Sequence, residues 1–257
     1  MSALEAQTRL PITTGDWALR PLKTSETVAR DIVDDIVDQG LRTGDHLPSE
    51  AAMLEQYGVS RESLREGLRL LEVQGLITLR RGPGGGPVVG RVDPGSLGRM
   101  STLYYHLAGA TYDELFEAWV LADGILAERA ARHPDRAAVR AAMEPYLTSE
   151  AYEHDDLAAF VSSHADFHSV MAGLARNRVL ELNLQGIGHI VTHHFVVNLD
   201  PRQVQEMIEE DHAEIARAIS AGHAVKARDA GERHILRMVE FYKGQIGDLQ
   251  FDFIDWR

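Results

Sequence analysis

Apolar side chains recur at helical spacing along most of the chain, beginning near Ser25. In the N-terminal part this pattern predicts three helices, which open near Ser25, Ser49 and Ser60. Serine suits the start of a helix, because its hydroxyl accepts a hydrogen bond from a free N–H group of the first turn. A glycine ends each of the three patterns, at positions 40, 58 and 75.

A short apolar segment follows the third predicted helix. Leu76 to Leu79 is typical of a strand, and Val88-Val89 of a second strand that returns beside it. The segment Pro83 to Pro87 between them contains three consecutive glycines and predicts a turn. Two helices that meet at a tight turn, followed by a β-hairpin, are the outline of a winged helix-turn-helix.

The pattern from Tyr112 onward is helical and predicts no strand. The candidate helices span residues 112–132, 135–151, 155–175, 178–198, 201–221 and 224–246. We therefore expect a mainly α protein, in which an all-α, ligand-binding helical bundle follows the winged helix-turn-helix. The expected parts are a tail at 1–20, a DNA-binding domain at 21–91, a linker at 92–111, a helical domain at 112–247 and a tail at 248–257.

Composition narrows the possible chemistry. The chain has 257 residues and no cysteine, which excludes disulfides, thiolate metal sites and cysteine nucleophiles. No apolar run approaches the roughly 20 residues that cross a bilayer, and residues 1–19 lack the features of a secretory signal. We expect a cytoplasmic protein with no membrane partner.

The formal net charge of -13 argues against a generally basic, nucleic-acid-binding surface. The acidic residues are not spread evenly along the sequence, however. The segment 60–81 carries a small local excess of arginines, at Arg61, Arg65, Arg69, Arg80 and Arg81. The expected third helix and hairpin are thus the region best suited to phosphate contacts.

The same region carries an ordered set of residues: Leu47-Pro48-Ser49-Glu50, Gly58-Val59-Ser60-Arg61, Leu64-Arg65-Glu66, Leu68, Leu71-Glu72 and Gly75-Leu76-Ile77. This set resembles the DNA-binding domain of the GntR family of bacterial regulators. The resemblance implies that the third helix enters the major groove of double-stranded DNA and that the hairpin tip reaches the minor groove. Two positions depart from the family pattern: Ala51 replaces a common arginine, and Glu62 a small hydroxyl residue.

Arg61 lies at the start of the third helix, where its two donors can reach a guanine edge, and Arg65 follows one turn later on the same face. The candidate DNA-contacting residues are Ser60, Arg61, Ser63, Arg65, Arg81 and Gly82. The alternative is a solvated helix face whose charges pair with one another. Because a two-fold operator demands a two-fold protein, we also expect a homodimer.

Histidine spacing suggests a second site. His164 and His168, like His189 and His193, are four residues apart, which puts both rings of a pair on one helix face. Asp166-Phe167-His168, Asn177, Asp211-His212, Ile215, Ile219 and His234 are together similar to the helical FCD-type sensor domain of the FadR-like branch of GntR regulators.

The resemblance implies a divalent metal on three histidines, here His168, His212 and His234. The metal-binding relatives have an aspartate four residues before the first of these, where this chain has His164. Four imidazoles favour a transition metal, zinc or nickel above all, and leave its charge uncompensated. That charge would attract an anionic small-molecule effector, such as an organic acid.

Four further residues are candidates for the effector site. Trp119 stands near the position of an arginine that holds an organic acid in many relatives, and Asp123 can support a ligand histidine. His189 and His193 lie on an otherwise apolar helix, so they either line the effector cavity or are polar spacers on a core helix.

Three functions remain open on these residues. A ligand-responsive DNA-binding regulator accounts for both parts of the chain. A regulator whose metal is purely structural is the second, because four protein ligands close a tetrahedral zinc site. A metal-dependent hydrolase is the third, but the sequence has no His-Glu-x-x-His motif and the helix-turn-helix would have no purpose in it.

Overall fold

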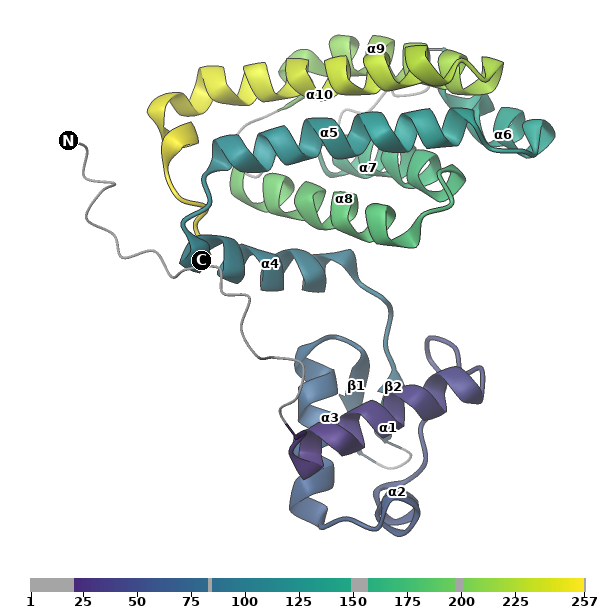
Figure 1. Ribbon diagram of the computed structural model, residues 1–257, viewed down its shortest axis with the longest axis vertical. Helices are drawn as coiled ribbons and strands as arrows, with labels where there is room; N and C mark the ends of the chain where they lie inside the picture. The colour runs from purple at the N-terminus through teal and green to yellow at the C-terminus, as the bar shows by residue number, and fades with distance from the viewer. Residues whose placement is uncertain (1–20, 83–84, 149–156, 197–200, 257) are drawn as a thin grey trace. The chain divides into compact units, whose positions relative to one another are not determined.

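The structure is a computed structural model that describes residues 21–82, 85–148, 157–196 and 201–256 (Figure 1). The chain forms two compact units, and the boundary between them falls between Ser96 and Leu97. No helix in these ranges is long and apolar enough to cross a membrane. The expected tail at 1–20 and the hairpin tip at 83–84 lie outside the described residues.

The N-terminal unit contains three helices and a two-stranded antiparallel sheet. Their bounds are α1 (Thr24–Asp38), α2 (Glu50–Tyr57), α3 (Arg61–Val73), β1 (Ile77–Arg80) and β2 (Gly86–Val89). The sheet register pairs Ile77 with Val89 and Arg80 with Gly86. Ile32, Met53 and Leu64 form the centre of an apolar core that α1, α2 and α3 share. The predicted winged helix-turn-helix is confirmed.

The turn between α2 and α3 is fixed by local hydrogen bonds. Ser49 accepts one from Ala52 N at 3.3 Å and Ser60 accepts one from Ser63 N at 3.1 Å, so both serines cap helices as predicted. Gly58 has a φ of +63°, a left-handed conformation that costs glycine little. This tight turn fixes the direction of α3 relative to α2. The direction in which the outer face of α3 points is therefore fixed as well.

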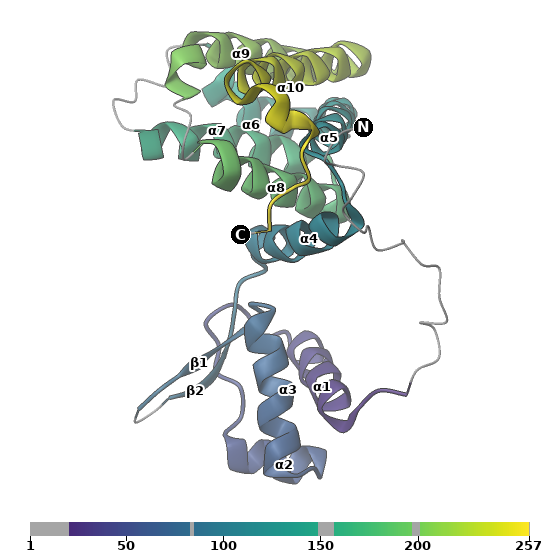
Figure 2. The same cartoon turned by 90° about the vertical axis from the view of Figure 1, so that its left-hand side faces the viewer.

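The C-terminal unit is a bundle of α-helices, as predicted (Figures 1 and 2). Its α-helices are α4 (Pro94–Ala108), α5 (Tyr112–Ala131), α6 (Arg136–Met143), α7 (Leu157–Leu174), α8 (Arg178–Val191), α9 (Gln205–Ala221) and α10 (Ala224–Ile246). Short helical turns are η3 (Glu144–Tyr146), η6 (Pro201–Val204) and η7 (Gly247–Phe251), and the π-helical segment is η5 (Thr192–Val196). Helix α5 is central, because it contacts α7, α8, α9 and α10.

The segment 92–111 contains helix α4 rather than an extended linker. Asp93 accepts hydrogen bonds from Gly95 N at 3.0 Å and Ser96 N at 3.1 Å, and thereby caps the first turn. Pro94 is the first helical residue, where its missing N–H group costs nothing. The Asp-Pro-Gly sequence that suggests a linker is therefore the start of a helix.

The described part of the expected C-terminal tail, residues 248–256, packs against the helical unit. Ile254 is only 1% exposed, and its N–H group donates to Ala110 O at 2.9 Å. Tyr112 holds the same segment, because its N–H donates to Asp252 O and its hydroxyl accepts from Asp255 N at 3.0 Å. The C-terminal segment thus pairs with the start of α5, a contact over a sequence distance that local patterns do not reveal.

Candidate metal centre and nucleic-acid interface

Four histidines converge inside the helical unit. His164 and His168 come from one face of α7, His212 from α9 and His234 from α10. All six distances between their ring centroids lie between 4.6 and 5.7 Å. The structure therefore brings together the four residues that the sequence suggests as metal ligands.

The centre is closed off from water on most sides. His212 and His234 are 1% and 0% exposed, and the side chain of His168 is 12% exposed. The ring of Phe167 stacks on His212 at a centroid distance of 3.9 Å, which gives the centre an apolar wall. Such burial removes the hydration that a charged imidazole needs.

Burial sets the protonation state of the rings. It lowers the pKa of His164 and of His212 well below the ordinary value for histidine, and neighbouring imidazoles lower both further. Burial also lowers the pKa of His234, although a hydrogen bond to Asp211 opposes this shift. The rings of His164, His212 and His234 are therefore neutral at neutral pH, which is the form that binds metals.

Two buried carboxylates orient two of the rings. Asp123 on α5, 0% exposed, accepts a hydrogen bond from Nδ1 of His168 at 2.8 Å. Asp211 on α9, 4% exposed, lies 3.3 Å from Nδ1 of His234. Because the proton of each ring is held at Nδ1, Nε2 keeps its lone pair. Asp123 is thus placed beside a histidine, as the sequence suggests.

The donor atoms fit a metal ion. His164 Nδ1, His168 Nε2 and His234 Nε2 are buried without a hydrogen-bond partner, an arrangement that is costly unless something else binds them. One ligand atom from each of the four histidines lies within 4.8 Å of the others. Two ligand nitrogens of a tetrahedral zinc ion are roughly 3.4 Å apart, since each bond is about 2.0–2.1 Å. Small side-chain movements would therefore suffice.

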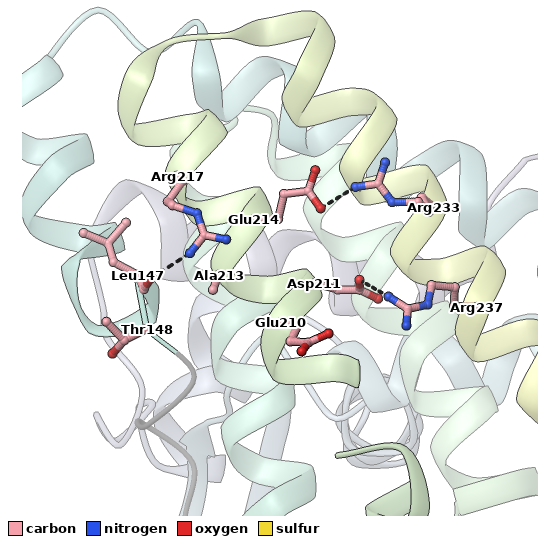
Figure 3. A pocket seen from close by; sticks show the side chains of 9 residues that line it. All are labelled: Leu147, Thr148, Glu210, Asp211, Ala213, Glu214, Arg217, Arg233 and Arg237. Carbon is pink, nitrogen blue, oxygen red and sulfur yellow. Dashed lines mark hydrogen bonds and ion pairs between the residues drawn. The ribbon is translucent and has the colours of Figure 1, made fainter. Parts of the chain in front are cut away.

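Asp211 also faces a hollow of about 600 Å³ on the outside of α9 and α10 (Figure 3). Arg237 donates to Asp211 at 2.5 Å, Arg233 pairs with Glu214 at 2.6 Å, and Arg217 donates to Leu147 O at 3.1 Å. The carboxylate of Asp211 therefore joins a surface arginine to a histidine of the centre. Sequence analysis missed this role, although Asp211 directly precedes His212.

The candidate effector residues Trp119, His189 and His193 are not part of the cluster of four histidines. His189 and His193 stack at a ring distance of 6.1 Å, and His193 lies 5.8 Å from His194 in the π-helical segment. This second histidine group begins where α8 ends, in a region where the sequence predicts one continuous helix to residue 198. Trp119 is 5% exposed and belongs to the apolar core around α5.

The exposed face of α3 carries a row of arginines. Arg61, Arg65 and Arg69 are spaced by one turn, and a shallow groove of about 490 Å³ runs along them. The side chains of Arg61 and Arg65 are 68% and 64% exposed. Arg69 was absent from the residues that sequence analysis assigned to DNA contacts, although its spacing places it on the same face.

Glu50 of α2 binds two of these arginines. Its Oε1 lies 3.3 Å from Nε of both Arg61 and Arg65. Glu50 belongs to the motif that resembles the GntR family. Its position beside α3 depends on the turn between α2 and α3, so it could not be predicted from the spacing of residues along a helix. Ser60 and Ser63, by contrast, bind each other at the helix start, at 3.0 Å between their hydroxyls.

The hairpin supplies the remaining candidates. Arg81 and Gly82 follow β1 directly and are exposed, and Gly82 has a φ of +98°. That conformation suits glycine and bends the backbone at the start of the hairpin turn. Arg81 and Gly82 are thus available to a ligand beside the hairpin.

Comparisons with known proteins agree with both units. Residues 24–85 match the family described as bacterial regulatory proteins, gntR family, and residues 114–237 match the FCD domain. The HTH-type transcriptional repressor NanR of Edwardsiella tarda (strain FL6-60) is 29% identical over 170 residues. That match covers 62% of this chain and 63% of the relative, so it spans less than two thirds of the relative's length.

A second relative and a solved structure extend these matches. NanR of Escherichia coli (strain K12 / DH10B) is 26% identical over 191 residues, which cover 70% of each chain. The structure titled Streptococcus agalactiae GntR aligns with a TM-score of 0.61 at 23% identity, over 84% of this chain and 99% of that one, and supports the fold. The chain belongs to the GntR family of transcription regulators, in the FadR-like branch with a helical FCD domain, and its relatives are regulators rather than enzymes.

Proposed function

We propose that this regulator binds a divalent transition metal at His164, His168, His212 and His234, and that a small anionic effector at or beside this metal controls its affinity for an operator. The observation that carries the proposal is the set of buried ring nitrogens that converge without hydrogen-bond partners. A metal ion would supply the missing partners and a positive charge that attracts the effector.

The ligand chemistry favours zinc or nickel. Imidazole nitrogen is the donor that these ions prefer, whereas magnesium and calcium prefer oxygen. Asp211 already pairs with Arg237, so Asp123 is the one nearby carboxylate whose charge is not balanced by an arginine among the described ion pairs. A divalent ion would therefore leave a net positive centre, which favours a carboxylate or another anion as effector.

The DNA-binding role is assigned to α3 and the hairpin. Arg61 and Arg65 would read the major groove, with Ser60 and Ser63 near a phosphate and Arg81 and Gly82 at the wing. Arg69 extends the same face. Since operators of this kind are two-fold, we propose a homodimer that acts in the cytoplasm, where bacterial DNA lies.

A purely structural metal is the competing function. Four protein ligands close a tetrahedral zinc site, and a closed site leaves no position for an effector. The observation in favour is that all four candidate ligands are protein side chains on three helices, which a metal would tie together. Metal would then raise the stability of the protein without changing its DNA affinity.

The test begins with metal content. Elemental analysis of protein purified without added metal, and titration of stripped protein with Zn²⁺ or Ni²⁺, should give one ion per chain for the wild type. His168→Ala and His234→Ala should bind much less, whereas His193→Ala, from the second histidine group, should bind as the wild type does. Equal metal content in all four proteins would refute the site.

Binding to DNA then separates the two roles of the metal. The probe is a duplex selected by the wild-type protein from a random-sequence library, at fixed salt concentration. For an effector site, succinate should change the affinity of the metal-loaded protein for this duplex, and neutral succinamide should not. If stripping the metal lowers the melting temperature but neither stripping nor any of a panel of small anions alters DNA affinity, the metal is structural.

A further inference from the structure

A narrow slot between α7 and α9 reaches the histidine centre. It is lined by Phe160, His164, Ile208, Glu209 and His212. On α7, Phe160 lies one helical turn before His164, and on α9, Glu209 lies one turn before His212. The slot is too narrow to hold a water molecule, and Nδ1 of His164 is buried without a hydrogen-bond partner. The slot therefore leads from Glu209 to two of the four imidazoles.

Apolar side chains close the slot. Phe160 and Ile208 are 3% and 2% exposed and belong to the apolar core of the helical unit. Apolar side chains of this kind offer no ligand to a cation. Among the described residues that line the slot, Glu209 is the one with a charged side chain. A cation that passes between Phe160 and Ile208 therefore finds an oxygen ligand at Glu209.

The carboxylate of Glu209 is held in place, and its charge is not balanced. Its Oε1 accepts a hydrogen bond from Gln205 Nε2 at 2.6 Å, one turn earlier on α9. Glu209 is partly exposed, so it meets the solvent as well as the slot. No lysine or arginine that the structure describes forms an ion pair with it, and a hydrogen bond from a neutral amide leaves its negative charge intact. Glu209 thus presents an uncompensated negative charge to ions in solution.

The two carboxylates on other sides of the centre are less suited to receive a cation. Towards α10, Asp211 pairs with Arg237 at 2.5 Å, and the positive charge of the arginine repels a cation. Towards α5, Asp123 is 0% exposed and binds His168 at 2.8 Å, so it cannot meet an ion that arrives from water. Among the described residues, Glu209 is thus the carboxylate beside the centre that is both exposed to solvent and free of an ion pair.

A divalent cation needs such a group on its way in. In water the ion carries a shell of water molecules, and a slot that admits no water strips this shell. Carboxylate oxygens are ligands that zinc accepts, so Glu209 can replace part of the shell before the imidazoles do. A carboxylate also attracts a cation over about 10 Å at about 0.1 M ionic strength, whereas neutral imidazoles act at contact. The burial of each group therefore sets the order in which they meet the ion.

We propose that Glu209 is the entry ligand of the histidine centre: its carboxylate receives a divalent transition-metal cation from solution and, as the side chain of Phe160 turns aside, delivers it to His164 and His212. The inference rests on the proposed function, because it requires that the four histidines bind the ion. It adds the route by which the ion arrives, and it gives a role to a residue that is not one of the four ligands.

The rates of metal exchange test this role. Stripped full-length protein is mixed rapidly with Zn²⁺ to measure association, and loaded protein with excess chelator to measure release. Glu209→Gln should slow association about tenfold, the lower end of what a charged cleft contributes. Release should slow as well, because the ion leaves by the same path, so the dissociation constant should change much less than either rate. Raising the ionic strength from about 0.01 M to about 1 M should slow association in the wild type and hardly affect Glu209→Gln.

Two variants serve as matched controls for the charge. Glu210→Gln removes the same charge one residue further along α9, but Glu210 lines the hollow outside α9 and α10 (Figure 3). It should therefore exchange Zn²⁺ as the wild type does. Glu209→Asp keeps a carboxylate beside the slot and should retain most of the association rate and its dependence on ionic strength.

Phe160 is tested by variants that open the slot. Phe160→Leu and Phe160→Ala should speed association and release by similar factors, more so for alanine, and leave the dissociation constant unchanged because the ligands remain. Phe195→Leu, at a buried aromatic residue of the same core that does not line the slot, should exchange as the wild type does. Melting curves of the stripped proteins show which variants fold, and the milder leucine variant decides the test where alanine prevents folding. Unchanged rates in Phe160→Leu would contradict the route.

Two results would overturn the entry role of Glu209. Equal association rates for Glu209→Gln, Glu210→Gln and the wild type at low ionic strength would remove Glu209 from the path. Faster release of Zn²⁺ from Glu209→Gln with unchanged association would make Glu209 a permanent ligand instead. The proposed function fails differently: a wild type that takes up no Zn²⁺ at equilibrium refutes the metal site and the entry role together, whereas full uptake at equal rates refutes the entry role alone.

Discussion

At the scale of single residues, Asp123 and Asp211 decide which nitrogens of the centre are available. Each carboxylate holds a proton on Nδ1 of one histidine, which leaves Nε2 of that ring unprotonated and without a hydrogen-bond partner. Loss of such a carboxylate typically costs a metal site about 10–100-fold in affinity. Asp123→Asn and Asp211→Asn should therefore each weaken Zn²⁺ binding by about that factor, as measured by competition with a chelating dye.

The matched control for this prediction is Asp166→Asn. Asp166 lies on α7 between His164 and His168, but it is exposed and points away from the centre. The substitution Asp166→Asn changes the net charge of the chain by the same amount as Asp123→Asn and Asp211→Asn do. If Asp166→Asn weakens Zn²⁺ binding as much as Asp123→Asn does, overall charge and not ring orientation determines the affinity.

Glu50 supports a second prediction at this scale. Its carboxylate holds Arg61 and Arg65 in place and neutralises part of their charge. In Glu50→Gln the arginines keep their charge but lose their anchor, so affinity for arbitrary DNA should rise while the preference for a selected duplex falls. Fluorescence anisotropy with selected and scrambled duplexes at equal salt measures both quantities.

Glu62→Gln is the comparison for Glu50→Gln. Glu62 is also an exposed carboxylate beside these arginines, but it forms none of the ion pairs described for Arg61 and Arg65. An equal loss of preference in both variants would mean that the anchor has no role.

The ion pair between Glu50 and Arg65 could not be predicted from the sequence. A turn between helices brings the two residues together, whereas helical spacing predicts only neighbours three or four residues apart.

At the scale of elements, close backbone contacts fix how α4 lies on α8. A Cβ at Gly98 would be 2.8 Å from Gly186 O and 3.1 Å from His189 Cδ2. The backbone oxygen cannot move without its helix, so Gly98→Ala should lower the free energy of unfolding by about 1–3 kcal/mol, as overpacking does elsewhere. Chemical denaturation of both proteins at one pH would give this difference.

Gly173 of α7 provides the opposite expectation. A Cβ there would meet nothing within 4 Å, and alanine favours a helix over glycine by about 0.5–1 kcal/mol. Gly173→Ala should therefore stabilise the protein by a similar amount. A destabilised Gly173→Ala, or a Gly98→Ala as stable as the wild type, would contradict the packing described for α4 and α8.

Element boundaries show where sequence patterns succeed. The helices α5, α9 and α10 were predictable because apolar residues recur along them and Gly222 separates α9 from α10. The helix predicted to begin at residue 201 starts with the short turn η6, and α9 itself begins at Gln205. Helix α4 could not be predicted from its amphipathic pattern. Its outer face is apolar and its packed face carries Gly98, Thr102 and His106, so the usual pattern of apolar residues inside and polar residues outside is inverted. The packing of the C-terminal segment could not be predicted for a different reason. The residues that it contacts precede it by more than 140 residues in the sequence.

At the scale of the whole molecule, the proposed metal binding at the histidine centre would stabilise the fold. Four imidazoles from α7, α9 and α10 meet in the bundle, so an ion that binds them favours the folded state by mass action. The pattern of the sequence predicted that these four histidines lie together, because two are four residues apart on one helix and a family resemblance indicated the other two. It could not indicate that burial would hold the rings of His164, His212 and His234 neutral, which follows from their packing.

The same burial makes the metal-free protein sensitive to acid. The pKa values of His164, His212 and His234 are lowered in the folded state, so the unfolded chain takes up protons first as the pH falls. The stability is therefore present above about pH 6.5, the value for histidine in an unfolded chain, and is lost progressively as the pH falls below it.

The measurement is the melting temperature of the stripped protein between about pH 7.5 and pH 5.5, a window that brackets the unfolded histidine pKa. It should fall steeply towards the acid side. His212→Leu, which removes one buried imidazole, should show a shallower fall, and the exposed His223→Gln should reproduce the wild-type curve. Saturating Zn²⁺ should raise the curve most at high pH, because protons and metal compete for the same nitrogens. A melting temperature that is flat across the window would show that these rings are not held neutral by the fold.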